Sequence, residues 1–179
     1  MSQKNLFFEG SAHVPLLIMP PQGRSLPHNI SVEAPTDLVD IYPTILAMAG
    51  LSSPVSVSGK NLLEPVPMDR MFFGNSLNKN FCVMEEKVKL VYSAVGDHVL
   101  LFDLNTDPME QHNLAEDPAW QERKAKLWKL LLEHTAQYTP EALGENGQFL
   151  TYEAPHFPGD VPGRWFGFHY HDYSVDTFH

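Results

Sequence analysis

The chain has 179 residues, of which 43% are hydrophobic and 11% are aromatic, and its formal net charge is -10. This length and composition indicate a folded protein with a real core and argue against wholesale disorder. The excess of acidic residues argues against nucleic acid or an anionic membrane as a partner, because both would repel the chain. The single cysteine, Cys82, excludes an internal disulfide.

Targeting and membrane signals are lacking in this sequence. Its apolar runs are all much shorter than the roughly 20 residues of a membrane-spanning helix. The first residues also lack the basic and then apolar pattern of a signal peptide. The sequence therefore predicts no membrane span and leaves the compartment open.

The first part of the chain has the pattern of a strand followed by a helix. Residues 14–19 form a short apolar run closed by two prolines and a glycine, which predicts a buried strand of a parallel α/β sheet. After a polar loop, Thr36 is expected to cap a helix that Gly50 ends, with apolar residues at helical spacing between them. Residues 1–51 are therefore predicted to be the end of a large α/β domain.

The middle of the chain has the pattern of a small sheet. Residues 52–68 are rich in Ser and Pro and are predicted to be a connection. Four β-prone runs follow between residues 70 and 104, separated by polar turns, and they predict an antiparallel meander. A helix expected from about Asp117 to Thr135 completes a small α+β subdomain over residues 69–137. Its apolar face, which should cover the sheet, carries Trp120, Leu127, Trp128 and Leu131.

The remaining residues, 138–179, are rich in Pro, Gly, His and aromatic residues without a helical or strand period. We expect an extended segment that packs on the protein or on a neighbouring subunit, because exposed aromatic side chains would lose a large apolar burial. The aromatic residues on which this expectation rests are Trp165, Phe166, Phe168 and Tyr170. A homo-oligomer formed through the tail is one of the two arrangements it allows.

One acidic stretch has the spacing that opens a calcium loop. Residues 103–107 place carboxylates and an amide at alternate positions. Pro108 stands where a calcium loop needs a turning Gly, and Leu114 stands where it needs a bidentate Glu. A turn at the end of a strand is therefore the favoured interpretation.

Two further sets of side chains are of residue types that can carry chemistry. His169 and His171, together with His156 and His179, could converge on a transition metal, but their spacing is unspecific, and ordinary histidines are favoured. Cys82 lies in a strand-like run, which favours an inert buried thiol over a nucleophile.

Three segments together carry a family resemblance. They are "KNLFFEGSAHVPLLIMPPQG" at residues 4–23, "DLVDIYPTILAMAGL" at residues 37–51, and "KLVYSAVGDHVLLFDLNTDPMEQHNLAED" at residues 89–117. In this order and at these distances they resemble the carboxyl-terminal third of the sulfatase family, in the alkaline-phosphatase-like superfamily. The sequence departs from the family at His13, where the family usually has Arg, and residues 138–179 match no general family pattern.

This resemblance implies an α/β fold and sulfate-ester chemistry. The fold would be the terminal strand and helix of an alkaline-phosphatase-like sandwich, followed by a small four-stranded antiparallel sheet with a packed carboxyl-terminal helix. The activity would be that of a sulfuric ester hydrolase that uses a calcium ion and a formylglycine nucleophile. The family's Cys/Ser-x-Pro-x-Arg motif is absent here, since Cys82 is followed by Val-Met-Glu and Ser56 stands where Ser52 would need its Arg.

The resemblance therefore implies that the nucleophile and the metal ligands belong to a missing amino-terminal catalytic portion. It aligns Lys4 with the active-site lysine that binds the sulfate group. A fixed ammonium would stabilise the negative charge of the transferring group. The alternative, a solvated terminal residue, is favoured for the isolated chain, which is predicted to be inactive; in the parent enzyme the catalytic role is favoured.

Other functions stay open at this point. A phosphonate or phosphodiester hydrolase, or a phosphoglycerol transferase, would use related architecture on another anionic ester. A non-catalytic remnant that acts as an interaction module is the third alternative. A secreted, periplasmic or lysosomal compartment would agree with the family resemblance.

Overall fold

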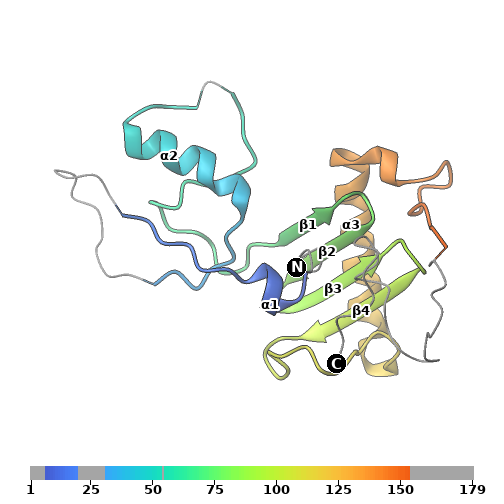
Figure 1. Ribbon diagram of the computed structural model, residues 1–179. Helices are drawn as coiled ribbons and strands as arrows, with labels where there is room; N and C mark the ends of the chain where they lie inside the picture. The colour runs from blue at the N-terminus through green and yellow to red at the C-terminus, as the bar shows by residue number, and fades with distance from the viewer. Residues whose placement is uncertain (1–6, 20–30, 54, 154–179) are drawn as a thin grey trace, which may run out of the picture. The chain divides into compact units, whose positions relative to one another are not determined.

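The computed structural model of the protein describes residues 7–19, 31–53 and 55–153 (Figure 1). Their contacts divide the chain into two compact units. One unit combines residues 1–14 with residues 73–179, and the other comprises residues 15–72. The amino-terminal segment therefore groups with the small sheet rather than with the helix that follows it in sequence.

The first unit is built on a four-stranded sheet. Its strands are β1 (Phe72–Ser76), β2 (Asn80–Glu85), β3 (Val88–Ser93) and β4 (His98–Asp103), and they lie in the order β1-β2-β3-β4. β3 is antiparallel to both β2 and β4, with Val83, Leu90 and Leu101 in register across the three strands. The predicted four-stranded meander is confirmed.

The turn between β2 and β3 is tight and conformationally unusual. Glu86 and Lys87 both have positive φ angles, 52° and 62°. Two consecutive left-handed residues are what a two-residue hairpin turn of the favoured hand requires. Neither residue is the Asn or Gly that usually marks such a turn, so the pairing of β2 with β3 rather than turn chemistry determines this hairpin.

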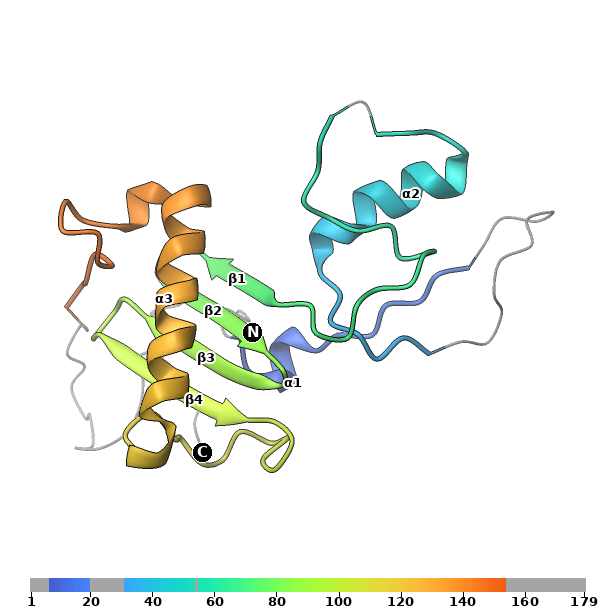
Figure 2. The same ribbon diagram turned by 180° about the vertical axis from the view of Figure 1, so that it is seen from behind.

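One helix covers one face of this sheet. It begins with a 3₁₀ turn, η2 (Pro118–Trp120), and continues as α3 (Gln121–Tyr138). The Asp117 side chain accepts a hydrogen bond from the Ala119 N–H at 2.8 Å, which satisfies one donor at the helix start. Leu127 and Leu131 are buried against the sheet, and α3 crosses it in Figure 2. The predicted packed helix is confirmed.

The segment after α3 adds to the same core. A short 3₁₀ turn, η3 (Pro140–Ala142), leads to Phe149, whose ring centroid lies 4.5 Å from that of Phe81 and 4.7 Å from that of Tyr92. Tyr152 then forms a parallel bridge with Val95. This part of the predicted tail packs on the protein, whereas the tail aromatics at residues 165–170 and the histidines at 156, 169, 171 and 179 lie outside the described residues.

The second unit contains the other predicted helix. It starts with a 3₁₀ turn, η1 (Leu38–Asp40), and continues as α2 (Ile41–Ala49). Asp37 rather than Thr36 caps it: Asp37 accepts from the Leu38 N–H, and the Asp40 carboxylate accepts from the Asp37 N–H at 2.8 Å. Gly50, with φ of 76°, ends the helix as expected.

The strand predicted for residues 14–19 does not form. These residues have neither helical nor strand structure, and Leu17 and Met19 are 94% and 86% exposed. A strand buried on both faces is stabilised by neighbouring strands and covering helices. No strand pairs with this run within the described part of the chain, so its apolar pattern alone does not make it a strand.

Candidate functional site

The candidate site is defined by the segment that follows Lys4. Lys4 itself lies outside the described residues. Residues 7–13, called the entry segment here, are described and include the short helix α1 (Glu9–Ala12). α1 lies on the face of the sheet opposite α3 (Figures 1 and 2).

A buried lysine binds the entry segment. Lys89 is the second residue of β3, and its side chain is only 3% exposed. Its Nζ donates to the Phe7 carbonyl at 2.8 Å, to Glu110 Oε1 at 2.8 Å, and to the Glu9 carboxylate. An ammonium has three N–H donors, and each has an acceptor here. Lys89 is therefore fully satisfied although it is removed from water.

Glu110 completes the same cluster from the loop after β4. Its Oε2 accepts a hydrogen bond from the backbone N–H of Glu9 at 2.6 Å, while Oε1 accepts from Lys89. Glu110 has a φ of 54°, in the left-handed region that a non-glycine residue adopts only at a cost in free energy. One carboxylate thus joins the sheet to the backbone of the entry segment.

The electrostatics of this cluster favour charged groups. Burial acts to lower the pKa of Lys89, but the hydrogen bonds that its ammonium donates to Glu110 and Glu9 outweigh this effect and raise the pKa above its ordinary value. Two carboxylates facing one ammonium leave a formal excess of one negative charge. His13 Nδ1 lies 2.9 Å from Glu9 Oε2, the other oxygen of the carboxylate that binds Lys89.

Aromatic contacts also hold the entry segment. The Phe7 ring lies so close to Gly74 of β1 that a Cβ on Gly74 would approach its Cε1 to 2.3 Å. The Phe8 ring lies 5.8 Å, between centroids, from the ring of Phe102, which pairs with Lys89 across β3 and β4. Polar and apolar contacts therefore fix the same few residues.

A second buried ion pair lies within the other unit. Arg70 donates through both terminal nitrogens to Asp40, at 2.6 and 2.9 Å, and also to the Pro35 carbonyl at 3.3 Å. Asp40 further accepts from the Lys60 N–H at 2.7 Å. Burial acts to raise the pKa of Asp40, but these hydrogen bonds, above all that from Arg70, lower it below its ordinary value.

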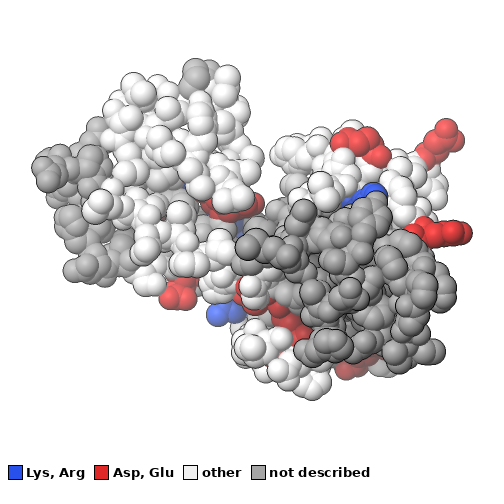
Figure 3. All heavy atoms as spheres, viewed as in Figure 1, with Lys and Arg blue, Asp and Glu red and all other residues white. Residues whose placement is uncertain are grey.

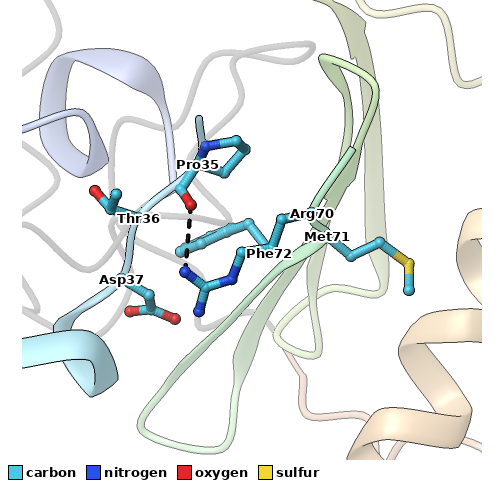
Figure 4. Close-up of a pocket in the computed structure, with 6 residues that line it drawn as sticks. All are labelled: Pro35, Thr36, Asp37, Arg70, Met71 and Phe72. Carbon is cyan, nitrogen blue, oxygen red and sulfur yellow. Dashed lines mark hydrogen bonds between the residues drawn. The ribbon is translucent and has the colours of Figure 1, made fainter. Parts of the chain in front are cut away.

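Arg70 lines a pocket together with neighbouring residues of the same unit (Figure 4). The pocket residues are Pro35, Thr36, Asp37, Arg70, Met71 and Phe72. Because the guanidinium already donates to Asp40 and to Pro35, it is a structural clamp between the start of α2 and the chain before β1 rather than an anion-binding group.

The calcium-like stretch is a turn, as expected. Asp103 Oδ1 accepts from the N–H and the side-chain amide of Asn105, at 3.1 and 2.9 Å, and Oδ2 accepts from Thr106 Oγ at 2.9 Å. Its carboxylate is occupied by local hydrogen bonds of the kind that stabilise turns. The structure thus confirms a strand-end turn at this position.

Cys82 is buried on β2, and burial raises the pKa of its thiol to about 12. The burial expected from the sequence is confirmed, and a buried, protonated thiol is a poor nucleophile. Across residues 7–19, 31–53 and 55–153, no three His, Cys, Asp or Glu side chains gather as a metal site. Within the same residues no helix is long and apolar enough to cross a bilayer.

On the face seen in Figure 3, acidic side chains are more prominent than basic ones.

The sequence analysis missed the cluster of Lys89, Glu9 and Glu110. One signal for it was present, since a lysine interrupts the apolar run of β3, all six residues of which are buried. A lysine in such a strand requires acceptors, because Lys is almost never fully buried unpaired. Its partners come from residues 80 and 21 positions away, which a local pattern does not reveal.

Comparison with known proteins identifies the family. The family model described as "N-sulphoglucosamine sulphohydrolase, C-terminal" matches residues 1–137. The chain belongs to this family. The match includes Lys4, the entry segment, α2, the whole sheet and all of α3 except its last residue. Membership in the N-sulphoglucosamine sulphohydrolase carboxyl-terminal family confirms the resemblance to the carboxyl-terminal part of sulfatases.

Individual relatives agree with this membership. The chain is 34% identical over 131 residues to arylsulfatase K of Bos taurus, covering 63% of this chain and 24% of that protein. It is 38% identical over 124 residues to choline-sulfatase of Rhizobium meliloti (strain 1021), covering 63% and 23%. The chain thus spans about a quarter of the length of these curated relatives. Among solved structures, the phosphonate monoester hydrolase of Agrobacterium radiobacter matches 65% of this chain and 29% of its own, with 27% identity and a TM-score of 0.47.

Proposed function

We propose that this chain is the carboxyl-terminal part of a sulfatase that hydrolyses sulfate esters, and that Lys4 is its contribution to the active site. The observation that carries the proposal is the family match over residues 1–137. Arylsulfatase K and choline-sulfatase, whose names specify sulfate esters, support it over the phosphoryl-transfer alternatives and over a non-catalytic remnant.

The proposed role of Lys4 is electrostatic. Hydrolysis of a sulfate ester concentrates negative charge on the oxygens around the sulfur and on the leaving oxygen. A fixed ammonium lowers the barrier where this charge develops, provided that it is already in place before the reaction. Lysine suits this role because its charge is compact and its three N–H donors can point to several oxygens.

The calcium ion and the formylglycine nucleophile expected for such an enzyme do not fit the described residues. Those residues contain no cluster of metal-binding side chains. Glu9 is the carboxylate nearest to Lys4 in sequence, and it already pairs with Lys89. Glu110, on the loop after β4, pairs with the same lysine. We therefore assign the metal ligands and the nucleophile to the part of the enzyme that precedes this chain's family-matched region.

The same part of the enzyme would provide the partner for residues 14–19. This run is apolar yet exposed, and Leu17 is the most exposed of its side chains. We propose that in the complete enzyme it is the terminal strand of the large α/β domain, which would include residues 1–51. Pairing with that sheet would bury the apolar side chains on both faces.

The test compares two substrates on the complete enzyme. We expect turnover of p-nitrophenyl sulfate well above that of p-nitrophenyl phenylphosphonate. The 179-residue chain alone should hydrolyse neither, because it lacks the activated nucleophile. Phosphonate hydrolysis without sulfate hydrolysis would contradict the proposal in favour of phosphoryl chemistry, and activity of the chain alone would contradict the assignment of the nucleophile.

A further inference from the structure

The fold of the small sheet does not require a buried charged residue at position 89. Lys89 pairs with Phe102 across β3 and β4, and its near neighbours on the same face, Cys82, Val91 and Leu100, are apolar and buried. An apolar side chain at position 89 would complete this face without removing a charge from water. Buried ion pairs are often no more stabilising than the hydrophobic residues that can replace them. The presence of a lysine therefore calls for an explanation other than stability of the sheet.

Unlike an apolar residue, Lys89 can bind the main chain of the entry segment through hydrogen bonds. Its ammonium binds the Phe7 carbonyl, 82 residues away, and the Glu9 carboxylate, 80 residues away. Glu110 binds the Glu9 N–H as well as the ammonium. These contacts therefore fix the main chain of the entry segment at two places, the C=O of Phe7 and the N–H of Glu9.

This fixed backbone is close in sequence to Lys4. Three residues of fully extended chain span at most about 10 Å, so anchoring Phe7 limits the volume that Lys4 can reach. Electrostatic stabilisation of a transition state requires that the charge be placed beforehand, and a misplacement of about 1 Å can cost about a hundredfold in rate. An anchor at Phe7 and Glu9 is what such placement needs.

We propose that Lys89 and Glu110 are positioning residues for the active site: they anchor the backbone from Phe7 to Glu9 on the small sheet and thereby place Lys4. The inference rests on the proposed role of Lys4. It gives the small sheet a purpose in catalysis, since the anchor lies on β3 and on the loop after β4. Neither residue touches the substrate in this proposal, so both act through the entry segment.

The first test measures the anchor without any substrate. Amide hydrogen exchange is compared in the 179-residue chain for Lys89→Met, for the milder Glu110→Gln, and for Lys87→Met as an exposed control in the adjacent turn. We expect exchange of residues 7–13 to accelerate about tenfold or more in the first two variants, with α3 still protected, and to be unchanged in the control. Unchanged exchange of residues 7–13 in a folded Lys89→Met or Glu110→Gln variant would overturn the proposal.

The second test asks whether the anchor acts through Lys4. In the complete enzyme, Lys89→Met and Glu110→Gln should lower kcat for p-nitrophenyl sulfate about 10- to 100-fold, with a smaller change in KM. Introduced into a Lys4→Ala background, either substitution should lower kcat no further. Losses that multiply in the double variants would contradict the proposal, because the two residues would then act elsewhere.

The outcomes separate this inference from the proposed function. If the unsubstituted complete enzyme does not hydrolyse the sulfate ester, the proposed function is wrong, and the positioning role for a sulfatase site is wrong with it. If the enzyme is active and Lys4→Ala is impaired but Lys89→Met and Glu110→Gln are not, only the positioning role is wrong.

Discussion

Truncating Phe149 to Ala should destabilise the sheet unit strongly, although this residue lies beyond the region that the family model matches. Phe149 is 7% exposed, and its ring contacts those of Phe81, Tyr92 and Trp128 at centroid distances of 4.5, 4.7 and 5.5 Å. Removing a buried Phe side chain costs about 3 to 5 kcal/mol. The loss of the aromatic pairs places the expected value in the upper part of that range.

The measurement is thermal unfolding followed by tryptophan fluorescence and far-ultraviolet circular dichroism. For a unit of this size, about 4 kcal/mol corresponds to a decrease in Tm of roughly 15 to 30 °C. Leu150→Ala is the matched control, because Leu150 is the next residue and is 40% exposed. A decrease for Phe149→Ala no larger than that of the control would refute the placement of Phe149 in the core.

Three further outcomes are expected. Trp128→Ala should destabilise the protein by less than the roughly 3 to 5 kcal/mol of a fully buried Trp, because Trp128 is half-buried, and equilibrium unfolding that shows no change would contradict the packing of α3. Asp40→Asn should cost about 3 to 5 kcal/mol at pH 7 by leaving Arg70 without its carboxylate. Because folding lowers the pKa of Asp40 from 3.8, the ionised carboxylate should stabilise the fold above pH 3.8, and this stabilisation should be lost as the pH falls through the lowered value. Urea unfolding between pH 2 and 7 should show this loss in the unsubstituted protein and not in Asp40→Asn. Cys82 should resist a thiol reagent in the native protein and react once it is unfolded; rapid native labelling would contradict its burial.

The elements that the sequence predicted correctly are those that local patterns determine. The strands β1 to β4 have short apolar periods bounded by turn residues, and α3 has an apolar stripe at helical spacing. Each of these patterns can be recognised within a single strand or helix, and each element buries its own apolar residues. The helix cap was misplaced by one residue because Thr36 and Asp37 can both cap, and the Asp40 side chain, which bonds the N–H of Asp37, decides between them.

The features that the sequence did not predict depend on distant contacts. Residues 14–19 have the apolar pattern of a buried strand, but a strand also needs neighbours to pair with, and the described chain provides none. Phe149 looks like one aromatic residue among many in a tail, and only its contacts with the rings of Phe81, Tyr92 and Trp128 make it part of the core. The anchor of the entry segment at Lys89 likewise depends on partners far away in sequence.

The most direct test of the central claim is the turnover of p-nitrophenyl sulfate by the complete enzyme with Lys4→Ala, beside Lys60→Ala as a control at an exposed lysine. The account predicts that Lys4→Ala lowers kcat about a hundred- to a thousandfold, as expected for the loss of one preorganised contact to the transition state, and leaves Tm unchanged. Lys60→Ala should keep full turnover. Turnover of the Lys4→Ala enzyme within about twofold of the unsubstituted enzyme would contradict the claim that this chain contributes a lysine to a sulfate-ester hydrolase site.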